Sequence, residues 1–490
     1  MASVKKVSLN VKILRQEPSF GTNPCYKNYN VEVNEGARVL DVLIAVRDNL
    51  DPSLSFRYCC GAGQCGSCAI KINGEPKLAC MNIAEDGMIL EPLDLPVIKD
   101  LAVDLVSELS KMPGLVPCGC GELPEKEEID KIKPIRDCIE CMCCVSVCPA
   151  MKVVDFAGPT LMRQEMRLAL DPRSSGNRVP LAVDEGLFTC TSCQACYLAC
   201  PKKIAIPGRA IEKLRELANR QGLTLDRHKA VAELVRTTGR SVEKAGETFL
   251  EMVPEVIEPY GEVRCEVGFF VGCMYNMRVV QTCLDTIEVL KRNGIRVIVP
   301  KDQVCCGSPL IRTGQTQILE NLKKTNIECF AKRGIDTVLT MCAGCGSTLK
   351  NDYDTPFEVI DINQLLVKYG IEPPEKLDVR VTYHDPCHLL RGQGVHDEPR
   401  ELIGMFAREF VEMPSICCGA GGGVRSGLPD EAKALGMKRG EEIGKTGCDI
   451  VVTSCPFCEF HIQESTDKPV KNINSLILEG YRKKDEKKAN

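Results

Sequence analysis

The stretch CIECMCCVSVCP at residues 138–149 holds four cysteines in the spacing C-x2-C-x2-C-x3-C, with a proline directly after the last. The same spacing returns in CTSCQACYLACP at residues 190–201. Thiolates spaced in this way hold 4Fe–4S clusters, and a run that ends in proline is not a zinc pattern. In paired runs, the fourth cysteine of each run binds the other cluster. Two 4Fe–4S clusters are therefore predicted, one with Cys138, Cys141, Cys144 and Cys200, the other with Cys190, Cys193, Cys196 and Cys148.

A third cysteine pattern lies nearer the N-terminus. CGAGQCGSC at residues 60–68, with a further cysteine at 80, has the C-x4-C-x2-C…C spacing of plant-type 2Fe–2S ferredoxins. Its glycines allow backbone angles that other residues resist. They also spell GxGxxG, but no βαβ unit surrounds them, so a dinucleotide site is not expected. The predicted ligands of one 2Fe–2S cluster are Cys60, Cys65, Cys68 and Cys80.

Hydrophobic periodicity predicts the fold around these cysteines. Residues 7–14 and 29–33 alternate as half-buried strands do, and residues 39–46 have the pattern of a short helix. This order favours a β-grasp ferredoxin domain, followed by an α-helical two-cluster ferredoxin domain whose first helix is predicted at 97–112. The predicted boundaries are 1–97 for the first domain and 98–261 for the second.

The second half of the sequence contains one cysteine pattern twice. In each copy a strand-like segment ends on one cysteine, a CCG triplet follows, and another strand ends on C-x2-C. The gap before the triplet is 31 residues in the first copy and 29 in the second. Each motif lies where a strand ends and a helix begins, which is where open α/β sheets place ligand sites. Duplicated α/β modules are therefore predicted at 262–375 and at 376–490, the second with the C-terminal tail. Their five-cysteine sets are Cys273, Cys305, Cys306, Cys342 and Cys345, and Cys387, Cys417, Cys418, Cys455 and Cys458.

Composition argues against several classes of protein. With 490 residues, 31 cysteines and a formal net charge of −5, the chain is too large for a secreted disulfide scaffold and lacks the basic character that suits nucleic acid. The N-terminal residues MASVKKVSLN have no signal-peptide core, and no 18-residue apolar run occurs. A cytoplasmic protein that binds neither nucleic acid nor membrane is expected.

The first half resembles the iron–sulfur subunit of succinate dehydrogenase and fumarate reductase. The resemblance rests on the ferredoxin loop, the two cysteine runs, and the segments INGEPKLAC (72–80) and LPVIKDLAVDL (95–105). It implies that electrons pass between these clusters and a flavin, FAD, on a partner subunit. That family usually lacks a cysteine at the position of Cys193 and has a 3Fe–4S cluster beside a quinone. The presence of Cys193 implies a second 4Fe–4S cluster and argues against the quinone role.

The second half resembles the catalytic subunit of the heterodisulfide reductase of methanogens, through its CCG triplets. The resemblance implies that each five-cysteine set holds a noncubane 4Fe–4S cluster and that the disulfide of coenzyme M and coenzyme B reacts between the two. The joined halves resemble the iron–sulfur subunits of thiol:fumarate reductases, which work with a flavoprotein partner. This implies oxidation of the coenzyme M and coenzyme B thiols, coupled to fumarate reduction on the flavoprotein.

Other residues near the cysteine loops are candidates for catalysis or substrate contact. His384 and His388 flank Cys387, and they either transfer protons to or from a thiol or hydrogen-bond the cluster loop. Four arginines near the loops would suit the sulfonate and phosphate groups of the thiol cofactors: Arg278, Arg312, Arg391 and Arg425. The alternative is a passive electron carrier of a flavin-linked 2-hydroxy acid, glycerol-3-phosphate or succinate dehydrogenase that feeds a quinone. Two complete repeats favour disulfide chemistry over that alternative.

Overall fold

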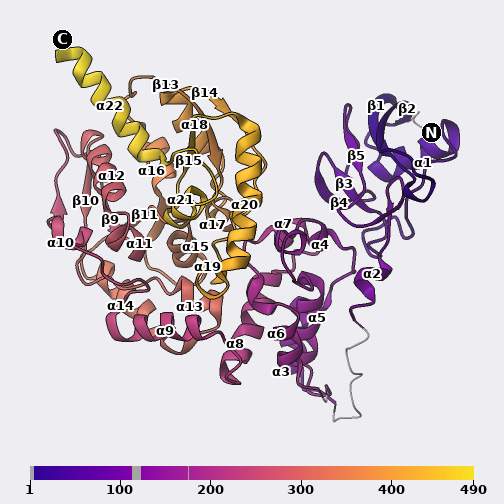
Figure 1. Ribbon diagram of the computed structural model, residues 1–490, viewed down its shortest axis with the longest axis horizontal. Helices are drawn as coiled ribbons and strands as arrows, with labels where there is room; N and C mark the ends of the chain where they lie inside the picture. The colour runs from indigo at the N-terminus through magenta and orange to yellow at the C-terminus, as the bar shows by residue number, and fades with distance from the viewer. Residues whose placement is uncertain (1–4, 113–122, 175, 490) are drawn as a thin grey trace. The chain divides into compact units, whose positions relative to one another are not determined.

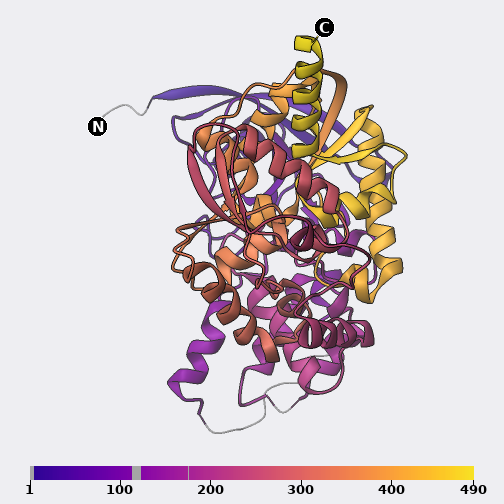
Figure 2. The same ribbon diagram turned by 90° about the vertical axis from the view of Figure 1, so that its left-hand side faces the viewer.

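The computed structural model describes residues 5–112, 123–174 and 176–489 (Figure 1; Figure 2). Cys118 and Cys120, two cysteines outside the cluster patterns, lie outside the described residues. The chain divides into two compact units, which we call the N-terminal unit and the C-terminal unit. The N-terminal unit comprises Met1–Lys152, Phe156–Leu187 and Gln194–Leu214. The C-terminal unit comprises Val153–Asp155, Phe188–Cys193 and Arg215–Asn490.

A five-stranded sheet in the N-terminal unit has the strand order β2-β1-β5-β3-β4. Its strands are β1 (Lys6–Arg15), β2 (Cys25–Asn34), β3 (Ala69–Ile72), β4 (Glu75–Leu78) and β5 (Ile89–Glu91). β1 pairs antiparallel with β2 and parallel with β5. Val11 and Ile13 of β1 are buried, and α1 (Val39–Asn49) packs on β2 and buries Val42 and Val46. The two strands and the helix predicted for this region are confirmed.

The helix predicted at 97–112 is wrong. These residues form β6 (Val97–Lys99), β7 (Ala102–Val103) and one short helix, α2 (Val106–Leu109). Asp100 lies at the turn between the two strands with φ 49° and is buried. Its carboxylate accepts hydrogen bonds from the Arg15 side chain (2.9 Å) and from the Ser55 backbone (2.9 Å). These tertiary contacts hold the turn and outweigh the helix-like spacing of the apolar residues.

Short helices make up the rest of the N-terminal unit. They are α3 (Lys126–Arg136), α4 (Cys143–Ser146), α5 (Pro159–Ala169), α6 (Arg178–Asp184) and α7 (Ala195–Ala199). α4 and α7 begin inside the two cysteine runs and pack against each other. α5 packs against α3, α4 and α6 and buries Leu161, Met162 and Met166. α8 (Glu212–Arg220) then carries the chain into the C-terminal unit.

The C-terminal unit contains two sheets, with the strand orders β12-β11-β9-β10-β8 and β14-β13-β15-β16. The first sheet has β8 (Val256–Ile257), β9 (Cys265–Phe270), β10 (Ile295–Ile298), β11 (Thr337–Thr340) and β12 (Glu358–Asp361). The second has β13 (Leu377–His384), β14 (Ala407–Val411), β15 (Ile450–Thr453) and β16 (Val470–Asn472). All neighbouring strands run parallel except β8, which lies antiparallel at an edge. In each sheet the strand that leads to the first cysteine of its set, β9 or β13, lies in the interior.

Helices cover both sheets and join them through one core (Figure 1). Before and around the first sheet lie α9 (Asp226–Thr238), α10 (Phe249–Met252), α11 (Cys273–Met277), α12 (Val280–Arg292), α13 (Ser308–Thr313), α14 (Leu319–Ala331), α15 (Ala343–Asn351) and α16 (Ile362–Tyr369). With the second come α17 (Cys387–Gln393), α18 (Asp397–Phe406), α19 (Val424–Gly427), α20 (Pro429–Thr446), α21 (Pro456–Gln463) and α22 (Ile473–Ala489). α12 packs against α22, and the shared core contains Phe269 of the first part and Tyr481 of the second. Across the described ranges, no helix combines the length and apolar character needed to cross a membrane.

Candidate functional site

Four cysteines of the N-terminal unit surround one small cavity, which leaves about 20 Å³ of free space. They are Cys138, Cys141, Cys144 and Cys200, so the last cysteine of the second run joins three from the first. This is the combination expected when paired runs exchange their fourth ligand. The hydroxyl of Thr160 lies 3.1 Å from the sulfur of Cys144. Burial raises the pKa of the Cys144 thiol, so a bound metal would be needed to hold it as a thiolate.

Both cysteine runs have the same local backbone. Glu140 and Met142 in the first run have φ angles of 51° and 61°, and Ser192 and Gln194 in the second have 52° and 63°. Positive φ is uncommon for residues other than glycine. Such angles persist only where the surrounding structure holds the loop in one shape. Cys148 and Cys196 belong to the N-terminal unit, whereas Cys190 and Cys193 belong to the C-terminal unit. Their assignment to one cluster stays a prediction.

The ferredoxin loop at 60–68 wraps its cysteines closely. Two backbone N–H groups point at the sulfur of Cys60, each at 3.4 Å. Backbone hydrogen bonding, first from Cys60, lowers the pKa of Cys65 to about 6, which favours the thiolate at neutral pH. Gly66 has φ +72°, and a Cβ at this position would lie 2.7 Å from the carbonyl of Ile139. The glycine therefore shapes its own loop and also lets the first cysteine run approach it.

The C-terminal unit contains a much larger cavity, with about 600 Å³ of free space. Nine of the ten cysteines in the five-cysteine sets line it: Cys273, Cys305, Cys306, Cys342, Cys345, Cys387, Cys418, Cys455 and Cys458. The tenth, Cys417, is buried, lies 3.5 Å from the hydroxyl of Thr191, and interacts with the thiol of Cys193. Cysteines from two different sheets thus face one space that is large enough for a small molecule.

Strand ends bring these cysteines together. Cys273 follows β9 and Cys387 follows β13, each as the first residue of a helix. Cys342 and Cys455 directly precede the helices that come after β11 and β15. Hydrogen bonds from the thiols of Cys345 and Cys455 lower the pKa of Cys342, whereas neighbouring thiols and burial raise the pKa of the other three. The thiols of Cys342 and Cys455 interact directly, so the two five-cysteine sets adjoin.

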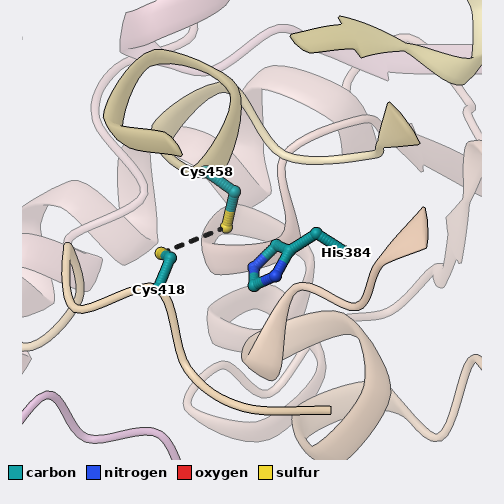
Figure 3. Close-up of side chains that lie close together, drawn as sticks. All are labelled: His384, Cys418 and Cys458. Atoms are coloured by element: carbon teal, nitrogen blue, oxygen red, sulfur yellow. Dashed lines mark hydrogen bonds between the residues drawn. The ribbon is translucent and has the colours of Figure 1, made fainter. Parts of the chain in front are cut away.

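The second cysteine of each CCG triplet is poised to ionise. Hydrogen bonds from the thiols of Cys305 and Cys345 lower the pKa of Cys306 to about 6. A hydrogen bond from the adjacent Cys417 thiol lowers the pKa of Cys418 well below its ordinary value. The sulfur of Cys418 lies 3.7 Å from that of Cys458 (Figure 3). These groups are ready to supply anionic sulfur ligands.

Three of the four predicted arginines line this cavity: Arg278, Arg312 and Arg425. Arg312 is ion-paired with Asp352 at 2.9 Å, and Arg425 with Glu464 at 2.8 Å. Arg278 is exposed and has no carboxylate within 4.0 Å among the residues that the structure describes. The charge of Arg278 is therefore the least compensated of the three.

Arg391 is placed differently from the other predicted arginines. It is absent from the described lining of the cavity, and its guanidinium donates to the carbonyl oxygens of Cys193 (3.4 Å) and Ser415. The geometry gives it the role of a cross-link between the second cysteine run and the loop before the second CCG triplet.

The two predicted histidines both lie against cluster cysteines. His388 lines the cavity, and its Nδ1 lies 3.7 Å from the sulfur of Cys387. Burial lowers the pKa of His388 to about 3, so its ring is neutral at physiological pH. A ring nitrogen of His384 and the sulfurs of Cys418 and Cys458 all lie within 4.8 Å of one another (Figure 3). His388 thus contacts the sulfur of Cys387, whereas His384 adjoins the two sulfurs without a hydrogen bond to either among the described residues.

Two further candidates have no sequence signal. His228 on α9 lines the cavity, and its Nε2 lies 2.9 Å from the carbonyl oxygen of Gly423, to which it donates. Arg439 on α20 is fully buried and donates from Nε to Nδ1 of His384 at 3.0 Å. Neither lies in a cysteine motif, so only the tertiary structure reveals them.

The cysteine sets suit iron–sulfur clusters. Each offers buried sulfur atoms from three loops, and backbone N–H groups point at them, from Gly307 to Cys305 (3.4 Å) and from Gly419 to Cys417 (3.4 Å). Such hydrogen bonds stabilise anionic sulfur. A donor set of thiolates fits a soft iron–sulfur cofactor and not a hard cation that prefers oxygen.

Three family models match the chain, in the order expected from its cysteine patterns. A 2Fe-2S iron-sulfur cluster binding domain matches residues 10–109, and a 4Fe-4S dicluster domain matches residues 134–204. A cysteine-rich domain, CCG, matches residues 267–350 and again residues 381–463. The chain is 44% identical over 491 residues to one subunit of the fumarate reductase (CoM/CoB) of Methanothermobacter marburgensis, and the match covers 96% of this chain and 98% of that protein. The chain belongs to this family.

Two other relatives extend the comparison. One subunit of the dihydromethanophenazine:CoB–CoM heterodisulfide reductase of Methanosarcina barkeri is 32% identical, over 59% of this chain and 76% of that protein. The crystal structure of a hypothetical protein from Helicobacter pylori shares the fold, with a TM-score of 0.64 and 13% identity over 98% of this chain and 95% of that one. This chain is thus the iron–sulfur subunit of an oxidoreductase related to fumarate reductase and heterodisulfide reductase, and its relatives' names imply partner subunits.

Proposed function

We propose that the chain oxidises the thiols of coenzyme M and coenzyme B to their heterodisulfide and delivers the electrons to the flavoprotein subunit of fumarate reductase. Forming one S–S bond from two thiols releases two electrons and two protons. Fumarate takes up two electrons and two protons to become succinate, on the FAD of the partner. The observation that carries the proposal is the single cavity lined by both five-cysteine sets.

The cavity suits a reaction that joins two sulfur atoms. A disulfide forms only when the two substrate thiols lie within bonding distance of each other. Because the two five-cysteine sets adjoin, each substrate thiol can face one set within the same cavity. When bound, noncubane 4Fe–4S clusters would supply one-electron chemistry to these sulfurs. Arg278, Arg312 and Arg425 would bind the anionic groups of the two substrates. The neutral ring of His388 would orient a thiol beside Cys387.

Four domains would together hold five clusters. A β-grasp domain at 1–97 holds one 2Fe–2S cluster, and the helical domain at 98–261 holds two 4Fe–4S clusters. Modules at 262–375 and 376–490, duplicates of each other, hold one noncubane 4Fe–4S cluster each. The repeated CCG match and the parallel strands of both sheets support the duplication.

Contacts within each unit support a relay toward the partner. In the C-terminal unit, Cys417 interacts with Cys193 of the second cysteine run. In the N-terminal unit, Gly66 of the ferredoxin loop lies against the loop of Cys141. Close approach of the loops shortens the distance that an electron must cover between their clusters. The flavin and dicarboxylate sites are assigned to the flavoprotein.

The competing function is a passive carrier, and cysteine variants of the complex distinguish the two. Cys306→Ser and Cys418→Ser should lower thiol-dependent fumarate reduction by more than about a hundredfold, because substrate chemistry needs both sets. Dye-dependent fumarate reduction, which needs only the flavoprotein, should persist. Cys448→Ala, a buried cysteine outside both sets, is the matched control and should retain both activities. Equal loss of both activities in the Ser variants would favour the carrier.

A further inference from the structure

The two five-cysteine sets differ in the residue that ends the strand before them. Phe270 ends β9, three residues before Cys273, and His384 ends β13, three residues before Cys387. Both side chains are buried. Phe270 packs on the ring of Phe330 at 6.2 Å between centroids, so a hydrocarbon side chain occupies this position in the first part. The second set meets an imidazole.

The hydrogen bond from Arg439 fixes the tautomer of that imidazole. The Nε–H of Arg439 donates to Nδ1 of His384 at 3.0 Å, so Nδ1 carries a lone pair. In a neutral ring the proton must then lie on Nε2. Nε2 is buried and has no hydrogen-bond partner among the described residues. His384 therefore holds an unused N–H donor beside the sulfurs of Cys418 and Cys458 (Figure 3).

Arg439 adds a positive charge that the surrounding protein leaves largely uncompensated. Its side chain is fully buried, and no carboxylate lies within 4.0 Å of it in the described parts of the chain. The nearby Asp385 is already paired with Arg400 at 2.9 Å and accepts from Ser415 at 2.6 Å. Burial lowers the pKa of Arg439, but a guanidinium stays charged in proteins.

In the first part, α13 directly follows the CCG triplet and contributes Arg312, which is ion-paired with Asp352 at 2.9 Å. The longer helix after it, α14, contributes no buried cation. There α14 contributes the neutral Asn326, which is buried, accepts from the backbone of Val304 (2.9 Å) and donates to the carbonyl of Cys305 (3.1 Å). The corresponding α20 of the second part contributes Arg439. The cations beside the first set are thus exposed, as in Arg278, or ion-paired, as in Arg312. The second set instead adjoins a buried cation and a buried imidazole.

We propose that Arg439 and His384 form an electrostatic bias that makes the second five-cysteine site easier to reduce than the first. A buried cation and an N–H donor beside the sulfur atoms both favour the more negative, reduced state of an iron–sulfur site. The inference rests on the proposed function in one respect, that each set holds a cluster. The two sites are then unequal. The second site, whose Cys417 interacts with Cys193, is the preferred electron acceptor.

The test is a redox titration followed by electron paramagnetic resonance on the anaerobically purified complex. Cys306→Ser and Cys418→Ser, each removing one site, assign the signals to the two sets. Arg439→Met and His384→Phe should then lower the midpoint of the second signal alone. At a fixed ambient potential, the ratio of its oxidised to reduced form should rise about tenfold, which is 59 mV for a one-electron couple. His384→Gln keeps both a donor and an acceptor, so it should restore the midpoint toward that of the unmodified protein.

Phe270→Leu is the matched control in the first set, and it should leave the second midpoint unchanged. Absence of any cluster signal from either set in the unmodified protein would overturn the proposed function. Two cluster signals with midpoints that Arg439→Met leaves in place would overturn the bias alone. If His384→Phe loses its cluster, Arg439→Met carries the test, because the imidazole is still present. Loss of the cluster in all three variants would show a structural role and also overturn the bias.

Discussion

The two cavities lined by cysteines use the same ligand atom in very different surroundings. The cavity of the N-terminal unit leaves about 20 Å³ beside its four cysteines, whereas that of the C-terminal unit leaves about 600 Å³. The larger one also contains arginines and a neutral histidine. An electron relay needs no spare room, because its centres stay fixed, but a bond-forming site must admit the reacting atoms. We propose that the larger cavity is the reactive site, because it alone of the two has arginines and a histidine in its described lining.

The largest expected effect comes from breaking the relay while sparing the reactive cavity. Cys200→Ala removes one of the four cysteines around the small cavity. Thiol-dependent fumarate reduction should fall by more than about a hundredfold, since electrons can no longer leave the C-terminal unit. The thiols should still bind, and their addition should still change the paramagnetic signals of the two five-cysteine sites.

Cys143→Ala is the control for that experiment. Cys143 is a buried cysteine of the first run and is absent from the described lining of the small cavity. Its removal should leave thiol-dependent turnover nearly unchanged. If Cys200→Ala also abolished the response of the five-cysteine sites to thiols, the two cavities would not be separate in function.

A smaller effect is expected from the charges around the larger cavity. Arg278→Gln should raise the KM for a thiol roughly fivefold, about 1 kcal/mol, because an exposed charge-assisted hydrogen bond is lost. Arg425→Gln should act more weakly, since Glu464 already compensates that charge. Arg391→Gln is the comparison outside the cavity, and steady-state kinetics should show no change in KM. A larger KM effect at Arg391 than at Arg278 would contradict the assignment of the substrate-binding face.

The cluster ligands could be predicted because their signal is local. Spacing such as C-x2-C-x2-C-x3-C-P records how a loop wraps a cluster, and the strand ends before Cys273 and Cys387 follow from short apolar runs. The structure places Cys200 beside the first run, as the exchange of fourth ligands predicts.

What could not be predicted depends on contacts between distant residues. The helix expected at 97–112 fails because Asp100 binds Arg15, which lies 85 residues away. The bond from Arg439 to His384 spans 55 residues. The cross-linking role of Arg391 likewise depends on its contact with Cys193, 198 residues earlier. Periodicity and spacing cannot report such pairs, because each is set by the packing of separate elements.

The smallest effect on activity is expected from a cluster of charged groups at the ferredoxin sheet. The same change tests whether the two units unfold separately. Asp51 is nearly buried and accepts hydrogen bonds from Lys27 (2.7 Å), Tyr29 (2.8 Å) and Arg15 (2.6 Å). These hydrogen bonds hold the pKa of Asp51 well below its usual range, and the bond from Lys27 has the largest effect. A depressed folded-state pKa adds stability above the unfolded-state value, near 4, and that stability is lost as the pH falls further.

Asp51→Asn should therefore lower the free energy of unfolding of the N-terminal unit by about 2 kcal/mol at pH 7, and by progressively less as the pH falls below about 4. Thermal unfolding followed by the visible absorbance of the 2Fe–2S cluster measures this, with Asp48→Asn as the control at an exposed carboxylate. The signals of the five-cysteine sites should keep their thermal midpoint, because Asp51 lies in the other unit. A loss of equal size at pH 7 and pH 3 would mean that packing, and not the ionised carboxylate, stabilises this sheet.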